Sequence, residues 1–294
     1  MIKIAYLASK VTLPGSPLRR SDAFEHDRMM EALTGPFADR GLQVEDVDWA
    51  DATIDWARYG AVIIGTTWDY WDRPQDFIDT LKRIEEKTKV FNGSDLVQWN
   101  SDKRYLRRFE KTGVRLIPTL WIDEVDETAY RAAFVQLKSD DLVFKRQVGA
   151  GADGQFRLSS KDPRPEMPHP MMVQPFLSTI QDEGELSFIF IDGVFCHALL
   201  KRAKAGDYRI QSTYGGTETP ITPSETDLAT AKRVLDTLIE TPLYARVDML
   251  RGEDGALRLM ELELIEPYLY PLEGPQLGSM LAHAVAKRLG LTHS

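Results

Sequence analysis

The chain has 294 residues, of which 43% are hydrophobic and 28% charged, as is typical of a globular protein with two or three domains. Its net charge of −9 argues against a nucleic-acid backbone or an anionic membrane surface as the main partner. The single cysteine, Cys196, excludes an internal disulfide framework and a cysteine-based metal site. No segment resembles a membrane span or a signal peptide, so we expect a cytoplasmic protein.

The first third of the chain alternates between short apolar runs and helical patterns. Strands are predicted at residues 3–8, 43–48, 61–65 and 90–91, and helices at residues 21–40 and from Pro74 onwards. Alternation of this kind predicts a parallel sheet covered by helices.

Polar and aromatic residues follow the buried strand predicted at residues 61–65. In an open parallel sheet, ligands bind beyond the carboxyl ends of the strands. Thr67, Asp69 and Tyr70 are therefore candidates for contact with a substrate. The alternative is that Trp68, Tyr70 and Trp71 only pack a domain interface.

Two lysines occupy positions that suit a phosphate group. Residues 100–112 are predicted as a helix with Lys103 in its first turn, where a lysine is either an ordinary surface residue or a ligand for an anion. Lys145 ends a strand predicted at residues 142–145, just before a loop that contains Gly149 and Gly151. A glycine-rich loop can lay backbone N–H groups over phosphates, although most such loops are plain hairpin turns.

The rest of the chain is predicted to consist mainly of strands. These are expected at residues 116–122, 155–158, 171–177, 185–192 and 194–200, with helices at residues 223–240 and 275–289. A cluster of basic residues follows the last of these strands and comprises Lys201, Arg202, Lys204 and Arg209.

The stretch 243–270 has the composition of a hairpin, because two apolar-rich runs flank the turn sequence GEDG. With Asp254 and Gly255 as the two turn residues, Asp248 lies opposite Glu261 and Arg246 lies opposite Glu263. Side chains alternate across a strand, so these four share one face. The core face is predicted to carry Val247, Met249, Met260, Leu262 and Leu264.

Three facing carboxylates repel one another, and Arg246 supplies only one compensating charge. Mg²⁺ takes oxygen ligands and commonly bridges carboxylates to substrate phosphates, so this face predicts a magnesium site. The alternative is a solvated hairpin face whose charges lie in water.

Several motifs together resemble the ATP-grasp superfamily of carboxylate–amine ligases, and within it the cycloserine-forming cyclo-ligases and the glutathione synthetases. The motifs are TWDY at 67–70, WNSDKRYL at 99–106, VQPFL at 173–177, YARVD at 244–248 and MELEL at 260–264. The resemblance implies an α/β (α+β) fold in which a parallel-sheet domain, residues 1–98, precedes a two-lobed ATP-grasp unit with antiparallel sheets. The implied lobes are a small lid subdomain, residues 99–175, and a metal- and substrate-binding subdomain, residues 176–294.

The resemblance also implies roles for individual residues. The implied ATP-binding residues are Lys103, Lys145, Gly149, Gly151, Gln174, Phe176, Leu177 and Glu185. The implied metal ligands are Asp248, Glu261 and Glu263, and the implied catalytic residues are Arg209 and Arg246. Two departures from the family pattern stand out: Glu263 replaces an asparagine common among relatives, and Arg146 replaces a proline.

The reaction implied is ATP-dependent. A carboxylate of a small amino-acid-like substrate becomes an acyl-phosphate and then condenses with a nitrogen nucleophile, with cyclisation of O-ureido-D-serine to D-cycloserine, a step of antibiotic biosynthesis, as the specific form. Two Mg²⁺ ions, with Mn²⁺ as a substitute, and a homodimer are implied as well. The alternatives are an ATP-grasp small-molecule kinase and a nucleotide-binding protein without turnover.

Overall fold

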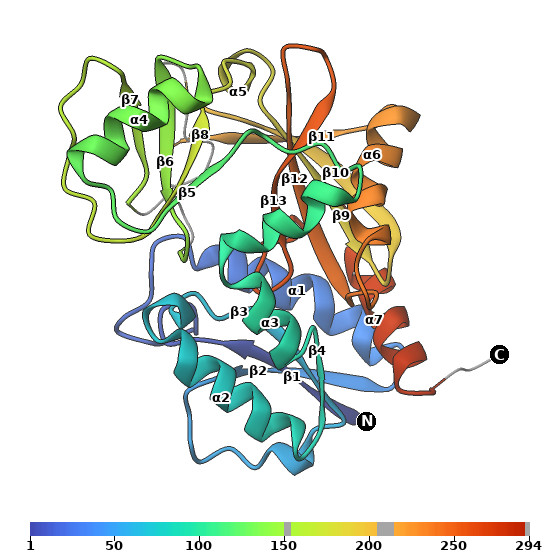
Figure 1. Ribbon diagram of the computed structural model, residues 1–294. Coiled ribbons are helices and arrows are strands. Elements are labelled where there is room, and N and C mark those ends of the chain that lie inside the picture. The colour runs from blue at the N-terminus through green and yellow to red at the C-terminus, as the bar shows by residue number, and fades with distance from the viewer. Residues whose placement is uncertain (150–153, 205–214, 292–294) are drawn as a thin grey trace.

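The computed structural model describes residues 1–149, 154–204 and 215–291 and is drawn in Figure 1. Its N-terminal layer is a parallel sheet with the strand order β2-β1-β3-β4. These strands are β1 (Ile2–Ala8), β2 (Leu42–Asp48), β3 (Ala61–Thr66) and β4 (Lys89–Phe91). The connections contain α1 (Phe24–Ala38), α2 (Pro74–Glu85) and the short 3-10 helices η1 (Trp56–Arg58) and η2 (Tyr70–Asp72).

Both faces of this sheet are covered. Ile4 and Tyr6 of β1 belong to the core shared with α1, whereas Ala5 and Leu7 belong to the core shared with α2. Strands buried on both faces are continuously apolar, which accounts for the sequence of β3. The C-terminal helix α7 (Leu277–Arg288) packs against α1 and so joins the end of the chain to its beginning.

The second sheet is antiparallel and has the order β5-β8-β6-β7. Its strands are β5 (Leu120–Ile122), β6 (Asp141–Arg146), β7 (Phe156–Ser159) and β8 (Met171–Pro175). Helix α4 (Glu127–Leu137) covers one face, with Tyr130 and Phe134 packed on Phe144 of β6. The Asp126 side chain caps this helix by accepting from the Ala129 N–H at 2.7 Å.

The third sheet is antiparallel with the order β11-β10-β9-β12-β13. Its strands are β9 (Glu185–Ile191), β10 (Val194–Arg202), β11 (Thr217–Ile221), β12 (Tyr244–Arg251) and β13 (Leu257–Glu263). The short α5 (Thr179–Asp182) precedes it, and α6 (Glu225–Asp236) packs on one face. Asp192 and Gly193 both have positive φ, which is the geometry of a tight hairpin turn between β9 and β10.

The helix predicted at residues 100–112 is a shorter 3-10 helix that follows a separate α-helix. Helix α3 (Ser94–Asn100) ends where that helix was expected to begin, and η3 (Lys103–Lys111) is a 3-10 helix. Asp102 separates them, because it is extended and its side chain accepts from the Arg104 N–H at 2.9 Å. Lys103 still occupies the first position of the new element.

The strand predicted at residues 116–122 is shorter than expected, because only β5 pairs within a sheet while Leu116 forms an isolated bridge to Leu259. The predicted fold class is confirmed, with a parallel α/β layer followed by antiparallel sheets. Each sheet lies within one of the three segments 1–98, 99–175 and 176–294, and we retain those boundaries as a proposal. No helix in the described ranges is long and apolar enough to cross a membrane.

Candidate active site

Strands β12 and β13 form a hairpin whose polar face opens onto a cavity. Asp248 pairs with Glu261, and Arg246 pairs with Glu263. Both pairs agree with the prediction from the sequence, and all four side chains line the same cavity. The strand alternation therefore places the charged face where the sequence indicated.

The predicted two-residue turn at Asp254 and Gly255 is wrong. Residues 252–256 connect the strands, and the register of the hairpin beyond Met249 differs by one residue from the predicted register. An extra residue in β13, Met260, forms a bulge that restores the pairing at the acidic residues. A bulge redirects a side chain, and Met260, predicted to lie in the core, lines the cavity instead.

Arg246 connects both strands to the loop that follows them. Its Nε donates to both carboxylate oxygens of Asp248 at 3.1 Å, and its other nitrogens donate to the Glu263 carboxylate and, at 3.0 Å, to the Tyr268 carbonyl. The side chain is only 10% exposed. Burial alone would lower the pKa of Arg246, but Asp248 and Glu263 raise it well above its usual value. The guanidinium is therefore a fixed positive charge at the centre of the site.

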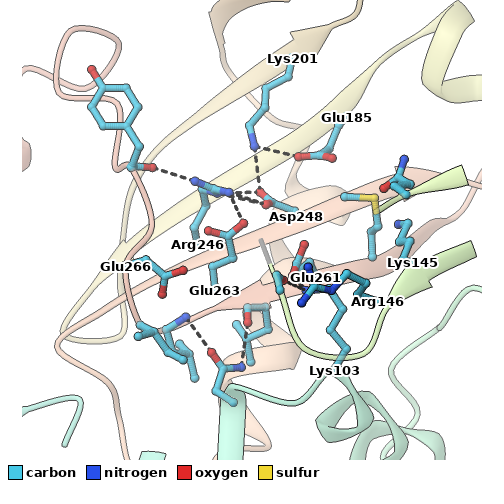
Figure 2. A pocket seen from close by; sticks show the side chains of 18 of the residues that line it. Lys103, Lys145, Arg146, Glu185, Lys201, Arg246, Asp248, Glu261, Glu263 and Glu266 are labelled. Carbon is cyan, nitrogen blue, oxygen red and sulfur yellow. Dashed lines mark hydrogen bonds and ion pairs between the residues drawn. The ribbon is translucent and has the colours of Figure 1, made fainter. Parts of the chain in front are cut away.

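A second buried network lies above the first in Figure 2. Lys201 of β10 places its Nζ 2.8 Å from Glu185 and 3.4 Å from Asp248. Ser187 donates a further hydrogen bond from its hydroxyl to Asp248. Burial would raise the pKa of Asp248, but Arg246 and Lys201 lower it to about 2. Asp248 is thus held ionised by its neighbours on both sides.

Lys103 of η3 and Lys145 of β6 both line the cavity (Figure 2). Lys103 Nζ lies 2.8 Å from Glu261 and donates to the Gly149 carbonyl, also at 2.8 Å. Lys145 makes no hydrogen bond or ion pair within the described ranges. Burial, and then the charge of Lys103, lower the pKa of Lys145. Two neighbouring lysines of this kind favour an anionic ligand.

Arg146, which follows Lys145, packs against the glycine-rich loop. Its Cδ lies 2.8 Å from the position that a Cβ on Gly154 would occupy. Gly154 also has a φ of +62°, so a larger residue there would be strained as well as crowded. Arg146, which stands where relatives have proline, therefore packs against a loop position that requires glycine.

The cavity has a volume of about 310 Å³ and is lined by both antiparallel sheets and by segments of the N-terminal layer outside its strands. The predicted adenine-site residues Gln174, Phe176 and Leu177 lie on its wall, together with Glu185. Gln174 donates to the Thr119 hydroxyl at 2.9 Å, which fixes its amide. An apolar wall with a few oriented polar groups is what small-ligand sites in proteins usually present.

The three predicted substrate residues are not equivalent. Tyr70 lines the cavity, but Thr67 is fully buried and does not. Asp69 also lies off the cavity, where it accepts a hydrogen bond from the Trp49 indole at 2.7 Å and pairs with Arg73. Neither Thr67 nor Asp69 lines the cavity, and their contact with a substrate stays a prediction.

Two predicted site residues cannot be placed. Arg209 and Gly151 lie outside the described residues, so their predicted roles stay predictions.

Three carboxylates have pKa values that burial raises towards neutrality. The pKa of Glu185 is raised to about 7, and that of Glu263 is also raised to about 7. Burial, and then the charge of Glu263, raise the pKa of Glu266 to about 8. Negative charge is therefore crowded on this wall of the cavity, and positive charge brought to it would be stabilising.

The donor set of this wall fits a hard divalent cation, since it consists of carboxylate oxygens and includes Glu185 Oε2, which is buried without a hydrogen bond. Within residues 1–149, 154–204 and 215–291, however, no three acidic, histidine or cysteine side chains converge into a ready metal site. Asp248, Glu261 and Glu263 are instead each paired with a lysine or arginine. Binding of a cation there would require some of these pairs to open.

Known proteins share features of this sequence and fold. Residues 4–92 match the model of the N-terminal domain of D-cycloserine synthetase DcsG. The cycloserine biosynthesis protein DcsG of Streptomyces lavendulae is 28% identical over 272 residues, which are 85% of this chain and 90% of that protein. The crystal structure of D-cycloserine synthetase DcsG matches with a TM-score of 0.83 at 25% identity, covering 98% of this chain and 99% of the other.

A structure of the ATP-grasp ligase PsnB with a precursor variant, Mg and ADP matches with a TM-score of 0.65 at 17% identity, over 98% of this chain and 99% of that one. The chain has the ATP-grasp fold. The predicted enzyme class, an ATP-grasp ligase similar to the cycloserine-forming proteins, is thereby confirmed.

Several residues of this ATP-grasp cavity were not singled out from the sequence. Lys201 was assigned only to a basic cluster, and Glu266 was given no role. Lys201 lies opposite Glu185 in the pairing of β10 with β9. Knowledge of that pairing would have placed the two side chains on the same face of the sheet. Tyr268 and Tyr270 follow the last strand in irregular structure, where no periodic signal exists.

Proposed function

We propose that the protein is an ATP-dependent ligase that activates the carboxylate of a small amino-acid-like substrate as an acyl-phosphate and joins it to a nitrogen nucleophile. The observation that supports this most directly is the shared cavity in which Lys103 and Lys145 face Arg246 and the acidic face of the hairpin. A single bound Mg-ATP could therefore contact the lysines through its phosphates and the carboxylates through its metal.

In this proposal Lys103 and Lys145 bind the phosphates of ATP. Gln174, Phe176 and Leu177 line the adenine site, and Glu185 accepts hydrogen bonds from the ribose hydroxyls. Lys103 is paired with Glu261 in the present structure, so binding of the nucleotide exchanges that carboxylate for a phosphate. Gly149 accepts from Lys103, which links the same lysine to the glycine-rich loop. Water must be kept from the reacting group in such a site, since acyl-phosphates hydrolyse readily.

Asp248, Glu261 and Glu263 would hold magnesium, two ions in our proposal, with Mn²⁺ as a substitute. When bound, Mg²⁺ supplies positive charge to the transferring phosphate group. ATP and Mg²⁺ as such agree with the Mg and ADP present in the related ligase PsnB.

The chemistry has two steps. A carboxylate oxygen of the substrate attacks the γ-phosphorus and ADP leaves; the nitrogen then attacks the acyl carbon, and phosphate leaves with the former carboxylate oxygen. Arg246 is buried and fixed by Asp248 and the Tyr268 carbonyl, so its positive charge is preorganised for the anionic oxygens that develop. No side-chain nucleophile is required, in agreement with Cys196, whose thiol pKa burial raises to about 12.

Cyclisation of O-ureido-D-serine to D-cycloserine is the specific reaction that we propose to test first. The support is the 28% identity with the cycloserine biosynthesis protein of Streptomyces lavendulae. A cytoplasmic location and a homodimer are retained as predictions from the sequence.

The experiment is to measure ADP release with Mg-ATP across D- and L-amino acids, short peptides and O-ureido-D-serine, followed by mass spectrometry of each active mixture. A ligase gives ADP and a product that has lost water. In the cyclisation the carbamoyl group is released as well, so that D-cycloserine is lighter than O-ureido-D-serine by carbon dioxide and ammonia. A small-molecule kinase gives a product heavier by a phosphate group instead. Tight ATP binding without ADP release in any mixture would favour a binding protein without turnover and would contradict the proposal.

A further inference from the structure

Glu266 differs from Glu185 and from the three carboxylates of the β12–β13 hairpin in its lack of a partner. Glu185, Glu261 and Glu263 each pair with a lysine or arginine, as does Asp248. In the part of the chain that the structure describes, the Glu266 carboxylate forms no ion pair and accepts no hydrogen bond from another residue. A carboxylate shielded from water strongly favours a cationic partner.

Tyr70 is the second polar group at this end of the cavity without a partner. Its side chain is 6% exposed and lines the cavity, and its Oη makes no hydrogen bond to a described residue. Glu266 lines the same cavity, and burial, followed by the charge of Glu266, raises the pKa of Tyr70 well above its usual value. A buried hydroxyl and a carboxylate are thus both available to one ligand.

Trp68 fixes the backbone of this corner and supplies an aromatic wall. Its indole Nε1 donates to the Glu266 carbonyl at 3.3 Å, and the indole also lines the cavity. The ring attracts positive charge, since the Arg20 guanidinium already lies 5.6 Å from its centroid.

The corner lies at the substrate end of the site rather than at the phosphate end. In Figure 2, Glu266 lies beside Glu263 and away from Lys145. A substrate whose carboxylate meets the γ-phosphate near the acidic hairpin would therefore extend its remaining groups towards Glu266. An amino acid carries one cation in that part of the molecule, its protonated amine, with three N–H donors.

We propose that Glu266, assisted by Tyr70, binds the protonated α-amino group of the substrate and so determines its specificity for amino acids over carboxylic acids that lack this group. The inference rests on the proposed function and names the substrate class of that same site. A site built to bind an N–H donor rejects analogues without it strongly, because its own polar groups are then left unpaired.

The test uses calorimetric binding to the full-length protein in the presence of magnesium and a non-hydrolysable ATP analogue. The probes are O-ureido-D-serine, D-serine and L-serine, each with the analogue in which hydrogen replaces the amino group. The wild type should bind at least one amine-bearing probe about 10- to 100-fold more tightly than its analogue, as expected for hydrogen bonds to a charged group. Glu266→Gln should abolish this preference, and Tyr70→Phe should reduce it several-fold.

Glu218→Gln is the matched control, because Glu218 also lines the cavity but lies on β11, away from Trp68 and Tyr70 in the sequence. It should keep the wild-type preference. An unchanged preference in Glu266→Gln, or no preference in the wild type for any amine-bearing probe, would overturn the inference. A rise in the magnesium concentration needed for binding, with the amine preference intact, would also overturn it, since Glu266 would then serve the metal.

The proposed ligase function and the proposed role of Glu266 can be contradicted independently. If the amine preference depends on Glu266 while no amino acid supports ADP release, the inference holds and the proposed ligase function fails. If ADP release is observed and the preference does not depend on Glu266, the function holds and the inference fails.

Discussion

Lys103 Nζ lies 2.8 Å from Glu261 Oε1, so a cation proposed for phosphate is held by a carboxylate proposed for magnesium. The same Nζ donates to the Gly149 carbonyl at 2.8 Å. Each partner thus neutralises the other before ligands bind. Binding of Mg-ATP would give Lys103 a phosphate and Glu261 a magnesium ion in place of each other.

Glu261→Gln should affect nucleotide binding in opposite directions with and without metal. Turnover of Mg-ATP should fall by about 100-fold or more, because a carboxylate aimed at developing charge is removed. Binding of metal-free ATP should tighten by a few-fold, since a partly exposed ion pair contributes roughly 1 kcal/mol or less and Lys103 is released from it. Titrations with and without a chelator would measure both effects.

The control is Asp254→Asn, a charge removal at the exposed tip of the same hairpin, where Asp254 pairs with Arg115 and Arg258. It should leave both affinities unchanged. An unchanged metal-free affinity in Glu261→Gln would show that the Lys103–Glu261 pair does not restrain the lysine.

Arg246 should be coupled energetically to Glu263. Arg246→Gln leaves Glu263 without its cation and Asp248 with Lys201 alone. Loss of one partner from a buried ion pair costs about 3–5 kcal/mol of the free energy of unfolding. Glu263→Gln in the same chain should recover part of that loss. Urea unfolding of both single variants and the double variant gives the coupling energy. Additive losses would contradict the network described for Arg246.

Asn92 should be a major link between the parallel layer and the hairpin. Its amide donates to the carbonyls of Tyr244 and Leu264 at 3.0 and 2.8 Å and accepts from the Leu243 N–H at 2.7 Å. Asn92→Ala should lower the free energy of unfolding by about 2–4 kcal/mol, because buried backbone groups lose their partners.

Backbone strain must be separated from these lost bonds, since Asn92 has a φ of +54°. Asn92→Gly adopts that φ freely, and it should still lose most of the stability measured for Asn92→Ala. Wild-type stability in Asn92→Gly would mean that the hydrogen bonds contribute little.

His197 should make the protein sensitive to mild acid. Burial lowers the pKa of His197 from 6.5 to about 4, and its ring packs against Gly274. The unfolded chain therefore binds a proton at a higher pH than the folded one. The contribution of the neutral ring is complete above pH 6.5 and is lost as the pH falls towards 4, by about 2–3 kcal/mol. Unfolding free energies of wild type and His197→Gln between pH 7 and 4 should diverge in slope; parallel curves would contradict this.

The hairpin illustrates how far sequence reasoning reaches. The pairing of Asp248 with Glu261 was predicted correctly although the turn was misplaced, because the bulge at Met260 offsets the longer turn. Hydrophobic alternation specifies which face is buried, and that constraint holds the acidic residues together. Turn length and bulges depend on local backbone geometry, which alternation does not report.

Thr67 and Asp69 show the opposite case. Their position after a buried parallel strand indicated a ligand contact, but neither residue lines the cavity, whereas Tyr70 in the same segment does. The contacts of Lys201 depend on pairing between β9 and β10 and between β9 and β12, so no local pattern reveals them. Long-range packing decides such positions, and the sequence alone does not contain that arrangement in readable form.

The central claim is that a substrate carboxylate is activated by phosphorylation, and isotope transfer tests it most directly. A turned-over substrate whose carboxylate carries ¹⁸O is incubated with Mg-ATP, and the inorganic phosphate released is examined by mass spectrometry. The account predicts one ¹⁸O in that phosphate, delivered when nitrogen displaces it from the acyl carbon. Unlabelled phosphate, or label found in AMP, would contradict an acyl-phosphate intermediate.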